Sequence, residues 1–208
     1  MDKIINQKKL YLVTDSGRYS HYKIANDAYH AGCDIIQLRY KGYSSHEFFE
    51  IATKIRKMMV KEADIFIVND RADIAKAVEA DCLHIGDDDI PFEFAKLICG
   101  VSIKIGLSTH NLDEAVQAEE MGVDYIGLGP IFFTKTKLLK HNPIGLDEIR
   151  KVRKLVNIPI VAISGINKLN ARSVLDAGAD AVAVSSAICH ADDIEKEVHL
   201  FFKEIDKV

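Results

Sequence analysis

The sequence predicts a single α/β domain folded as a small (β/α)₈ TIM barrel, and two observations lead to this prediction. Eight short apolar runs recur along the 208 residues, and amphipathic segments separate them. Three helix-to-strand junctions share one pattern, in which glycine, one further residue and aspartate follow a helix end: 31–34, 121–124 and 177–180. Such short connections suit an evenly wound barrel. A doubly wound open sheet is the alternative, but no G-x-G-x-x-G follows the first apolar run, so the usual dinucleotide-binding signal is missing.

The predicted strands are short and rich in β-branched residues, as buried parallel strands are. They cover residues 10–14, 34–38, 65–68, 82–85, 104–108, 124–131, 158–163 and 181–185. Apolar residues near helical spacing predict helices over 45–62, 112–121, 146–155 and 169–177. Gly122 and Gly178 directly follow two of these helices, as C-terminal caps do. In a barrel the residues that follow the strands gather at one face, and active sites lie there.

Composition favours one domain, spanning 1–208, that acts on small molecules. The chain is 48% hydrophobic and 28% charged, and its net charge of −4 argues against a nucleic-acid partner. No apolar stretch reaches transmembrane length and the N-terminus lacks a signal-peptide pattern, so no membrane partner is expected. The four cysteines are scattered without a C-x-x-C pair, which disfavours a zinc–thiolate site and favours a reduced, cytoplasmic setting. Association into a homo-oligomer stays open.

Two acidic residues follow neighbouring predicted strands. Asp70 comes after the third strand and Asp89 after the fourth, so their carboxylates are expected at the same barrel edge, where they could bind a hard cation. Helix capping is the alternative. Asp70 could cap a helix that starts at Arg71, with Asp73 as capping-box partner, and Asp89 could cap a helix opened by Pro91. This stretch alone favours neither alternative.

Basic residues follow the second strand. Gln37, Arg39 and Lys41 alternate with other residues and therefore share one face, which in a barrel strand is the interior or its mouth. Two cations that point into a barrel are costly unless an anion meets them. A solvated pair on the outside is the alternative.

The remaining strand ends carry hydroxyls, glycine and lysine. Ser108 could donate to a ligand, whereas His110 is more typical of a structural residue than of a catalytic base. Hydroxyls, lysines and a glycine suited to phosphate follow the sixth, seventh and eighth strands: Thr134, Lys135, Thr136, Lys137, Gly165, Ser185 and Ser186. A solvated basic loop is the alternative for 134–137, and the loop over 135–142 is a candidate lid.

These charges fit a diphosphate substrate. Arg39, Lys41 and Lys137 could hold a highly charged group, while Asp70 and Asp89 would repel it. A Mg²⁺ ion between the carboxylates and a diphosphate removes that conflict. No nucleophilic cysteine or Ser/His pair is evident, so the chemistry that remains is displacement of a diphosphate leaving group by positioning and electrostatics.

An ordered set of short motifs resembles the thiamine-phosphate synthase family over Leu10 to Ile188. The motifs are Q-L-R-x-K, N-D-R-x-D-I-A, H-I-G-x-x-D-x-P, S-x-H, G-P-I-F-x-T-x-T-K, I-P-I-V-A-I-x-G-I and V-S-S-A-I. The resemblance implies a transferase that joins 4-amino-2-methyl-5-(diphosphooxymethyl)pyrimidine to hydroxyethylthiazole phosphate. The implied products are thiamine phosphate and diphosphate.

The resemblance also implies roles for individual residues. The pyrimidine diphosphate contacts would be Gln37, Leu38, Arg39, Tyr40, Lys41, Asn69, Ser108 and Lys137, among which Arg39, Lys41, Lys137 and Ser108 would be catalytic. The thiazole phosphate contacts would be Thr134, Lys135, Thr136, Gly165, Ser185 and Ser186, and the Mg²⁺ ligands Asp70 and Asp89. The sequence departs from the family pattern at Asp87, where glutamine is usual, and at Ser164 and Cys82, where glycine is common.

Two other functions remain to be distinguished from the synthase. A thiazole tautomerase-like paralogue is an isomerase on the same barrel and need not keep the metal and diphosphate residues. A non-catalytic thiamine-precursor binding protein belongs to a different class. The intact set of cationic and acidic residues argues against both.

Overall fold

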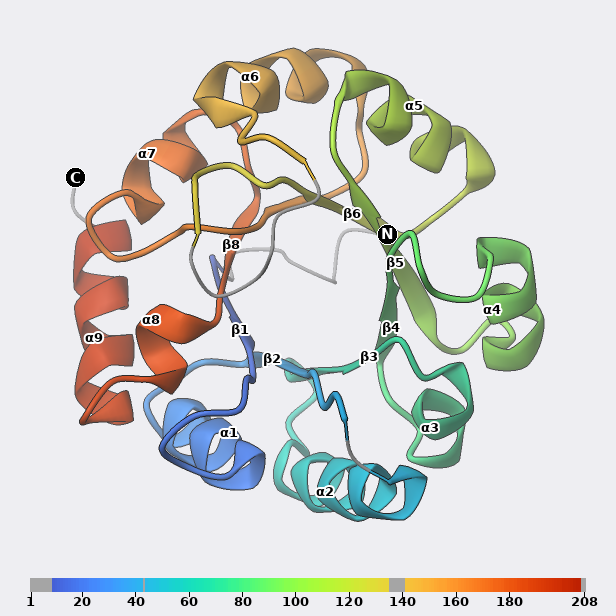
Figure 1. The fold of residues 1–208 in the computed structure, drawn as a ribbon, viewed down its shortest axis with the longest axis vertical. Coiled ribbons are helices and arrows are strands. Elements are labelled where there is room, and N and C mark those ends of the chain that lie inside the picture. Colours follow the sequence, from blue (N-terminus) through green and yellow to red (C-terminus); the bar gives the residue numbers. More distant parts are fainter. Residues whose placement is uncertain (1–8, 43, 135–140, 207–208) are drawn as a thin grey trace.

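A computed structural model of the protein describes residues 9–42, 44–134 and 141–206, and it is a closed barrel of eight parallel strands (Figure 1). The strands follow one another in chain order: β1 (Leu10–Val13), β2 (Ile35–Leu38), β3 (Ile65–Asn69), β4 (Cys82–Ile85), β5 (Lys104–Thr109), β6 (Tyr125–Leu128), β7 (Ile160–Ala162) and β8 (Ala181–Val184). Because β1 pairs with both β2 and β8, the sheet is closed. The predicted (β/α)₈ barrel is therefore confirmed, and the open doubly wound sheet is not what this chain forms.

The helices form an outer ring around the strands (Figure 1). They are α1 (His21–His30), α2 (Ser45–Met58), α3 (Ala72–Ala77), α4 (Phe92–Cys99), α5 (Leu112–Met121), α6 (Gly145–Leu155), α7 (Ala171–Asp176), α8 (Ser186–Cys189) and α9 (Ile194–Ile205). Ser44 begins α2 with a capping box, in which its side chain accepts from the amide of Glu47 and the Glu47 carboxylate accepts from the amide of Ser44. None of the helices among the described residues is long and apolar enough to cross a membrane.

Several strands and helices are shorter than the sequence predicted. The sixth strand ends at Leu128 and not at residue 131, because Gly129 and Pro130 follow and proline has no amide hydrogen for the ladder. The seventh begins at Ile160, directly after Pro159. The second helix ends at Met58, and the helix predicted over 169–177 is shorter, Ala171–Asp176.

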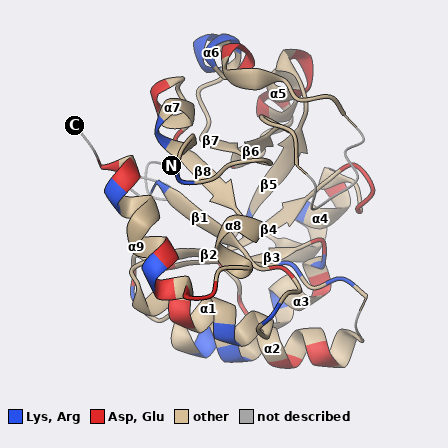
Figure 2. Cartoon of the chain, turned by 60° about the vertical axis from the view of Figure 1, so that its left-hand side comes forward, with Lys and Arg blue, Asp and Glu red and all other residues tan. Residues whose placement is uncertain are grey.

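The alternation of side chains along the strands divides the core in two. Outward residues pack between barrel and helices, for example Leu12, Phe66 and Val182. Inward residues fill the barrel interior: Tyr11, Ile35, Ile65, Ile67, Cys82, Tyr125, Val161, Ala181 and Ala183. Among Lys, Arg, Asp and Glu, only Lys104 lies within one of the described strands. Figure 2 shows the other charged residues of the described chain on the helices and loops. The inner core is therefore mainly apolar, with Gln37 of β2 and His84 of β4 as polar residues among its inward side chains.

The three repeated helix-to-strand junctions have a common structure. Gly32, Gly122 and Gly178 all adopt positive φ, which ends the preceding helix. Asp124 and Asp180 then accept a hydrogen bond from the first part of the preceding strand, at the amides of Ile105 (2.9 Å) and Ile160 (2.7 Å). These carboxylates connect neighbouring strands at the end of the barrel opposite to the strand carboxyl termini.

Replacing Asp124 with alanine is expected to lower the free energy of unfolding by about 1–3 kcal/mol, because it leaves the Ile105 amide unpaired. The side chain of Asp124 is only 18% exposed and also pairs with Lys104. Asp206→Ala is the matched control, since Asp206 is 68% exposed and 3.9 Å from Lys9. Its expected cost is under about 0.5 kcal/mol. Urea unfolding of both variants tests the difference, and equal losses would contradict this role for Asp124.

Candidate active site

A cavity of about 440 Å³ opens at the carboxyl ends of the strands, where active sites of such barrels lie. A smaller, more polar pocket adjoins it, and Arg39, Asn69, His84 and Ser108 line both. The predicted site residues whose placement the structure describes and that line these pockets are Gln37, Arg39, Lys41, Asn69, Asp70, Asp89, Ser108, Thr134, Gly165, Ser185 and Ser186. Residues from across the chain thus line two adjoining pockets.

The two acidic residues lie together in the polar pocket. Asp70 adopts the left-handed conformation (φ 64°), and its amide donates to the carbonyl of His84 (2.9 Å). Asp89 accepts from the amide of Gly86 through Oδ2 (2.8 Å). Burial and the neighbouring Asp70 carboxyl raise the pKa of Asp89 to about 6. The two carboxyl groups therefore resist being ionised together unless a cation joins them.

The capping alternative for these residues is wrong. The N-cap of α3 is Arg71 and the N-cap of α4 is Pro91, and neither makes a side-chain capping hydrogen bond. The Asp89 carboxylate accepts a hydrogen bond from the Gly86 amide within its own turn, and the Asp70 carboxylate lies beside the ammonium group of Lys41. Neither carboxylate is committed to a helix terminus, so both remain available to a ligand in the pocket.

The basic residues after β2 lie at the mouth of the barrel. The Nζ of Lys41 is 3.1 Å from Oδ2 of Asp70, and the Nη1 of Arg39 is 3.7 Å from Oδ1 of Asp15. The hydroxyl of the fully buried Thr14 accepts from the Arg39 amide (3.2 Å), which fixes the backbone at the point where β2 ends. Both cations line the polar pocket, and the side chain of Lys41 is 56% exposed there.

A chain of hydrogen bonds crosses the barrel interior below the pocket. Gln37 donates through Nε2 to the hydroxyl of Tyr11 (2.7 Å), which lies 3.4 Å from the hydroxyl of Tyr125. His84 joins the Tyr125 hydroxyl through Nδ1 (3.1 Å) and the Ser108 hydroxyl through Nε2 (3.0 Å). The chain therefore links the two predicted polar contacts, Gln37 and Ser108, through three residues that the sequence analysis did not identify.

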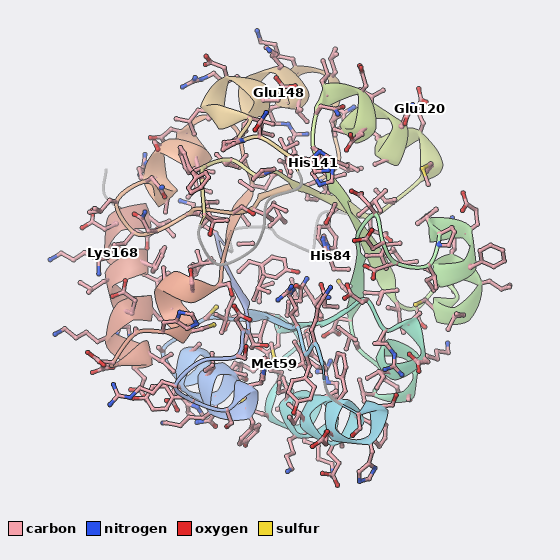
Figure 3. All side chains as sticks on the ribbon, viewed as in Figure 1. Met59, His84, Glu120, His141, Glu148 and Lys168 are labelled. Carbon is pink, nitrogen blue, oxygen red and sulfur yellow. The ribbon has the colours of Figure 1, made fainter. Side chains whose placement is uncertain are left out.

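Two glycines make room for this chain. A Cβ at Gly106 would lie 2.1 Å from Cζ of Tyr125, and a Cβ at Gly127 would lie 2.9 Å from Cε1 of His84. Gly106 on β5 is paired in register with both His84 on β4 and Tyr125 on β6, whereas Gly127 lies on β6, two strands away from His84. An inward glycine in register with a polar or aromatic residue on a neighbouring strand is the sequence signal that could have identified His84 and Tyr125 (Figure 3 labels His84). Tyr11 carries no such signal, because it pairs with Ile35 and Ala183.

His84 is expected to stay neutral at physiological pH, because burial lowers its pKa from 6.5 to about 4 against the opposing attraction of Asp70. The unfolded chain takes up a proton at this residue near its ordinary pKa, whereas the folded chain does not. Stability should therefore fall as the pH drops from about 6.5 to about 4, by at most about 1.4 kcal/mol per pH unit from this residue.

Urea unfolding of the protein and of His84→Gln across this range of pH tests the expectation. The variant should lose less stability on acidification than the parent protein does. His21, whose pKa burial also lowers, is retained in both proteins and so contributes equally. Identical pH profiles would show that His84 is not the group that stays neutral.

The loops after β7 and β8 form the other wall of the larger cavity. Gly165 has φ 71°, and a Cβ there would lie 2.7 Å from both Cβ of Phe132 and the carbonyl oxygen of Phe133. Ser185 and Ser186 stand where β8 ends and α8 begins. Ser164 also has positive φ (72°), so a serine occupies a conformation that glycine adopts with less strain.

Some predicted residues are not brought into the site. The side chain of Leu38 is buried in the outer core, and Tyr40 packs edge-on against His21 and Phe48, so neither residue lines the pockets. Lys135, Thr136 and Lys137 lie outside the described residues, as does the candidate lid over 135–142 except for its last two residues. The Nδ1 of His110 lies 2.9 Å from the Glu114 carboxylate, in keeping with the structural role expected for it.

Comparison with known proteins agrees with this arrangement. The model of the thiamine monophosphate synthase family matches residues 10–188. Thiamine-phosphate synthase of Methanosarcina mazei is 43% identical over 209 aligned positions, which cover 100% of this chain and 87% of that protein. The corresponding protein of Chloroflexus aurantiacus is 46% identical over 189 positions, 89% of this chain and 87% of that protein.

A solved structure of thiamine phosphate pyrophosphorylase from Pyrococcus furiosus superposes with a TM-score of 0.88 at 38% identity, and it covers 98% of both chains. More distant barrels share the fold alone, such as a 3-hexulose-6-phosphate synthase at 17% identity and a TM-score of 0.71. The match of the family model over residues 10–188 and the similarity to full-length relatives lead to one conclusion: the chain belongs to the thiamine monophosphate synthase family.

Proposed function

We propose that this protein is a thiamine-phosphate synthase, a transferase that joins an aminopyrimidine diphosphate to hydroxyethylthiazole phosphate and releases diphosphate. One observation carries the proposal. The acidic pair Asp70 and Asp89 lies beside Arg39 and Lys41 in a pocket that is continuous with a larger cavity bounded by Gly165 and Ser185. A pocket with both acidic and basic side chains, next to loops suited to bind a phosphate, fits two phosphorylated substrates bound side by side.

Asp70 and Asp89 fit a magnesium ion. They offer oxygen ligands, and burial together with the neighbouring Asp70 carboxyl raises the pKa of Asp89, a shift that a cation between the two groups would oppose. Lys41, at 3.1 Å from Asp70, gives only one positive charge to this pair. When held by Asp70 and Asp89, the ion would stabilise the negative charge that develops as the diphosphate leaves.

The diphosphate is expected to leave with the electron pair of its bond to the pyrimidine methylene carbon. Arg39 and Lys41 would hold the departing oxygens, and Lys137 is proposed as a third cation from the loop after β6. The aminopyrimidine ring can carry the positive charge left on the methylene, and the thiazole nitrogen then forms the new C–N bond. No proton moves at the reacting carbon, which explains why the site needs no dedicated base.

The interior hydrogen-bond chain would hold the pyrimidine ring. Gln37, Asn69 and Ser108 present polar groups at the cavity floor, and the chain through Tyr11, Tyr125 and His84 fixes two of them. Because His84 stays neutral, it orients the Ser108 hydroxyl without placing a second positive charge next to the developing cation. The apolar wall of Val161 and Ile163 keeps water from that carbon.

The second substrate would bind at the loops after β7 and β8. The Gly165 backbone and the hydroxyls of Ser185 and Ser186 suit the phosphate of the thiazole, with Thr134, Lys135 and Thr136 proposed as further contacts. Holding this phosphate across the cavity from Arg39 would direct the thiazole nitrogen to the methylene carbon. Positioning of this kind supplies much of the rate in reactions between two substrates.

The two other functions are less well supported. A thiazole tautomerase needs neither an acidic pair nor cations for a diphosphate, and a non-catalytic binding protein has no reason to combine them in one pocket. Here Gln37, Arg39, Lys41, Asp70 and Asp89 all line the site.

Incubation of the purified protein with both substrates and Mg²⁺ tests the proposal, with thiamine phosphate and diphosphate measured separately. Both products are expected in equal amounts, and omission of either substrate should abolish C–N bond formation. Folded protein that forms neither product would overturn the synthase assignment. Isomerisation of a thiazole carboxylate substrate without diphosphate release would favour the tautomerase.

A further inference from the structure

The outer face of α4 and its two flanking turns carry an exposed apolar patch that the proposed catalysis does not use. Five of the twelve large hydrophobic residues that are exposed in the described chain fall within residues 90–101: Ile90, Phe94, Leu97, Ile98 and Val101. Their exposed fractions reach 61% at Phe94, 80% at Leu97 and 96% at Val101. None of the five lines either pocket of the candidate active site. Apolar side chains gathered in this way on a protein surface mark an interaction site.

Helix α4 is apolar on two opposite faces. Its inner face is buried in the outer core of the barrel: Phe92, Ala95 and Cys99. Phe94, Leu97 and Ile98 are three and four residues apart, so they share the outer face. In contrast, α2, α6 and α9 carry many charged side chains (Figure 2). A helix that is apolar all round is normally covered on both sides, so the outer face of α4 calls for a partner.

The charges of α4 suit a second copy of the same helix. Within α4, all of whose residues are described, the charged side chains are Glu93 in the first turn and Lys96 in the last. Both are exposed, and at a spacing of three residues they lie along one edge of the patch. Two copies of the helix that pack antiparallel about a two-fold axis bring Glu93 of each copy towards Lys96 of the other. The patch is therefore complementary to itself, as an interface between identical chains must be.

The size of the patch also suits a pair of chains. At about 150–200 Å² for a fully exposed apolar residue, the exposed fractions of the five residues correspond to about 500–600 Å² on each chain. Two copies packed face to face would bury about 1,000 Å² from these residues alone, which reaches the size expected of a specific interface. Glu93 and Lys96 at the edge would add to that area.

We propose that the outer face of α4 is the interface of a homodimer, in which this helix packs antiparallel against α4 of a second copy of the chain. Phe94 and Leu97 lie near the centre of this interface, and Glu93 and Lys96 lie at its rim. Because α4 stands in the outer ring between α3 and α5, the pairing leaves the mouth of the barrel open (Figure 1). The proposal does not depend on the proposed reaction, since its residues lie outside both pockets.

Sedimentation equilibrium of the tag-free protein, without substrates and from micromolar to millimolar concentration, tests the proposal. A monomer–dimer equilibrium is expected. Leu97→Lys places an ammonium group of each copy in the centre of the interface and should raise the dissociation constant by about 10-fold or more. Leu155→Lys is the matched control, because Leu155 is 60% exposed in the last turn of α6, and it should leave the dissociation constant unchanged. A protein that stays monomeric at millimolar concentration, or equal effects of the two substitutions, would overturn the proposal.

Charge reversal tests the antiparallel arrangement. Glu93→Lys and Lys96→Glu should each weaken the dimer by about 5-fold or more, because each places like charges opposite one another twice, once on either side of the two-fold axis. The double variant should recover the dissociation constant of the unaltered protein, and an equimolar mixture of the two single variants should form heterodimers in preference to homodimers. A double variant as weak as the single ones would contradict the pairing of Glu93 with Lys96. Cooperative urea unfolding of each variant shows that the fold is intact.

Discussion

Replacing Asp70 with asparagine is expected to lower Mg²⁺-dependent kcat/KM by about 100-fold or more, because loss of even an outer-shell partner of a metal costs about 10- to 100-fold. The change removes one of the two carboxylates proposed to hold the ion and leaves Lys41 without its partner at 3.1 Å. It should also lower the pKa of Asp89, since the neighbouring carboxyl group that helps raise it is gone. Steady-state kinetics across a Mg²⁺ titration provide the measurement.

At this position, replacement by asparagine tests the role of the charge more directly than replacement by alanine. Asp70 has φ 64°, a conformation that Asp and Asn tolerate but that strains other residues by about 1–2 kcal/mol. Asp70→Ala would therefore combine loss of charge with backbone strain at the end of β3. Asp70→Asn keeps the side-chain shape and the left-handed backbone, so its effect reports on the charge.

Asp73→Asn is the control for Asp70→Asn. Asp73 lies in the first turn of α3, is 63% exposed and pairs with Arg71 at 2.5 Å, outside both pockets. Its substitution should leave kcat/KM within about twofold, as surface changes usually alter stability by no more than about 0.5 kcal/mol. Full Mg²⁺-dependent activity in Asp70→Asn would show that Asp70 is not a metal ligand.

The barrel was predictable because its signals are local and repeat along the chain. Short apolar runs, the glycine–aspartate junctions and the lack of linker-like sequence all pointed to the same closed sheet, and Gly122 and Gly178 have the positive φ that their positions suggested. The location of the site followed from topology, since every parallel strand ends at the same face. The exact ends of the strands were less predictable, because a single proline or a single ladder hydrogen bond can determine where a strand begins or ends.

The interior hydrogen-bond chain was not predictable from single motifs. Tyr11, His84 and Tyr125 stand on three different strands, and their contacts depend on how far each strand is staggered around the barrel. The sequence shows which residues face inward but not which of them lie at the same height.

Replacing Gly165 with alanine is expected to weaken binding of hydroxyethylthiazole phosphate by roughly 10- to 200-fold, while binding of the pyrimidine diphosphate changes little. A Cβ at this position would lie 2.7 Å from Cβ of Phe132 and from the carbonyl oxygen of Phe133, so the loop must move away from them. Loss of one hydrogen bond to a charged phosphate costs about 1.5–3 kcal/mol, which corresponds to that range of affinity. Isothermal titration with each substrate separately is the measurement.

Gly122→Ala separates crowding from backbone strain. Gly122 ends α5 with φ 82°, close to the 71° of Gly165, but a Cβ there would meet nothing within 4 Å. Both variants therefore carry a similar strain of about 1–2 kcal/mol, seen as a loss of unfolding free energy. Only Gly165→Ala also displaces the loop that faces the cavity, so only this variant should lose affinity for the thiazole phosphate. If Gly122→Ala weakened that affinity equally, the loss would reflect general destabilisation, and the phosphate would have to bind away from the β7–α7 loop.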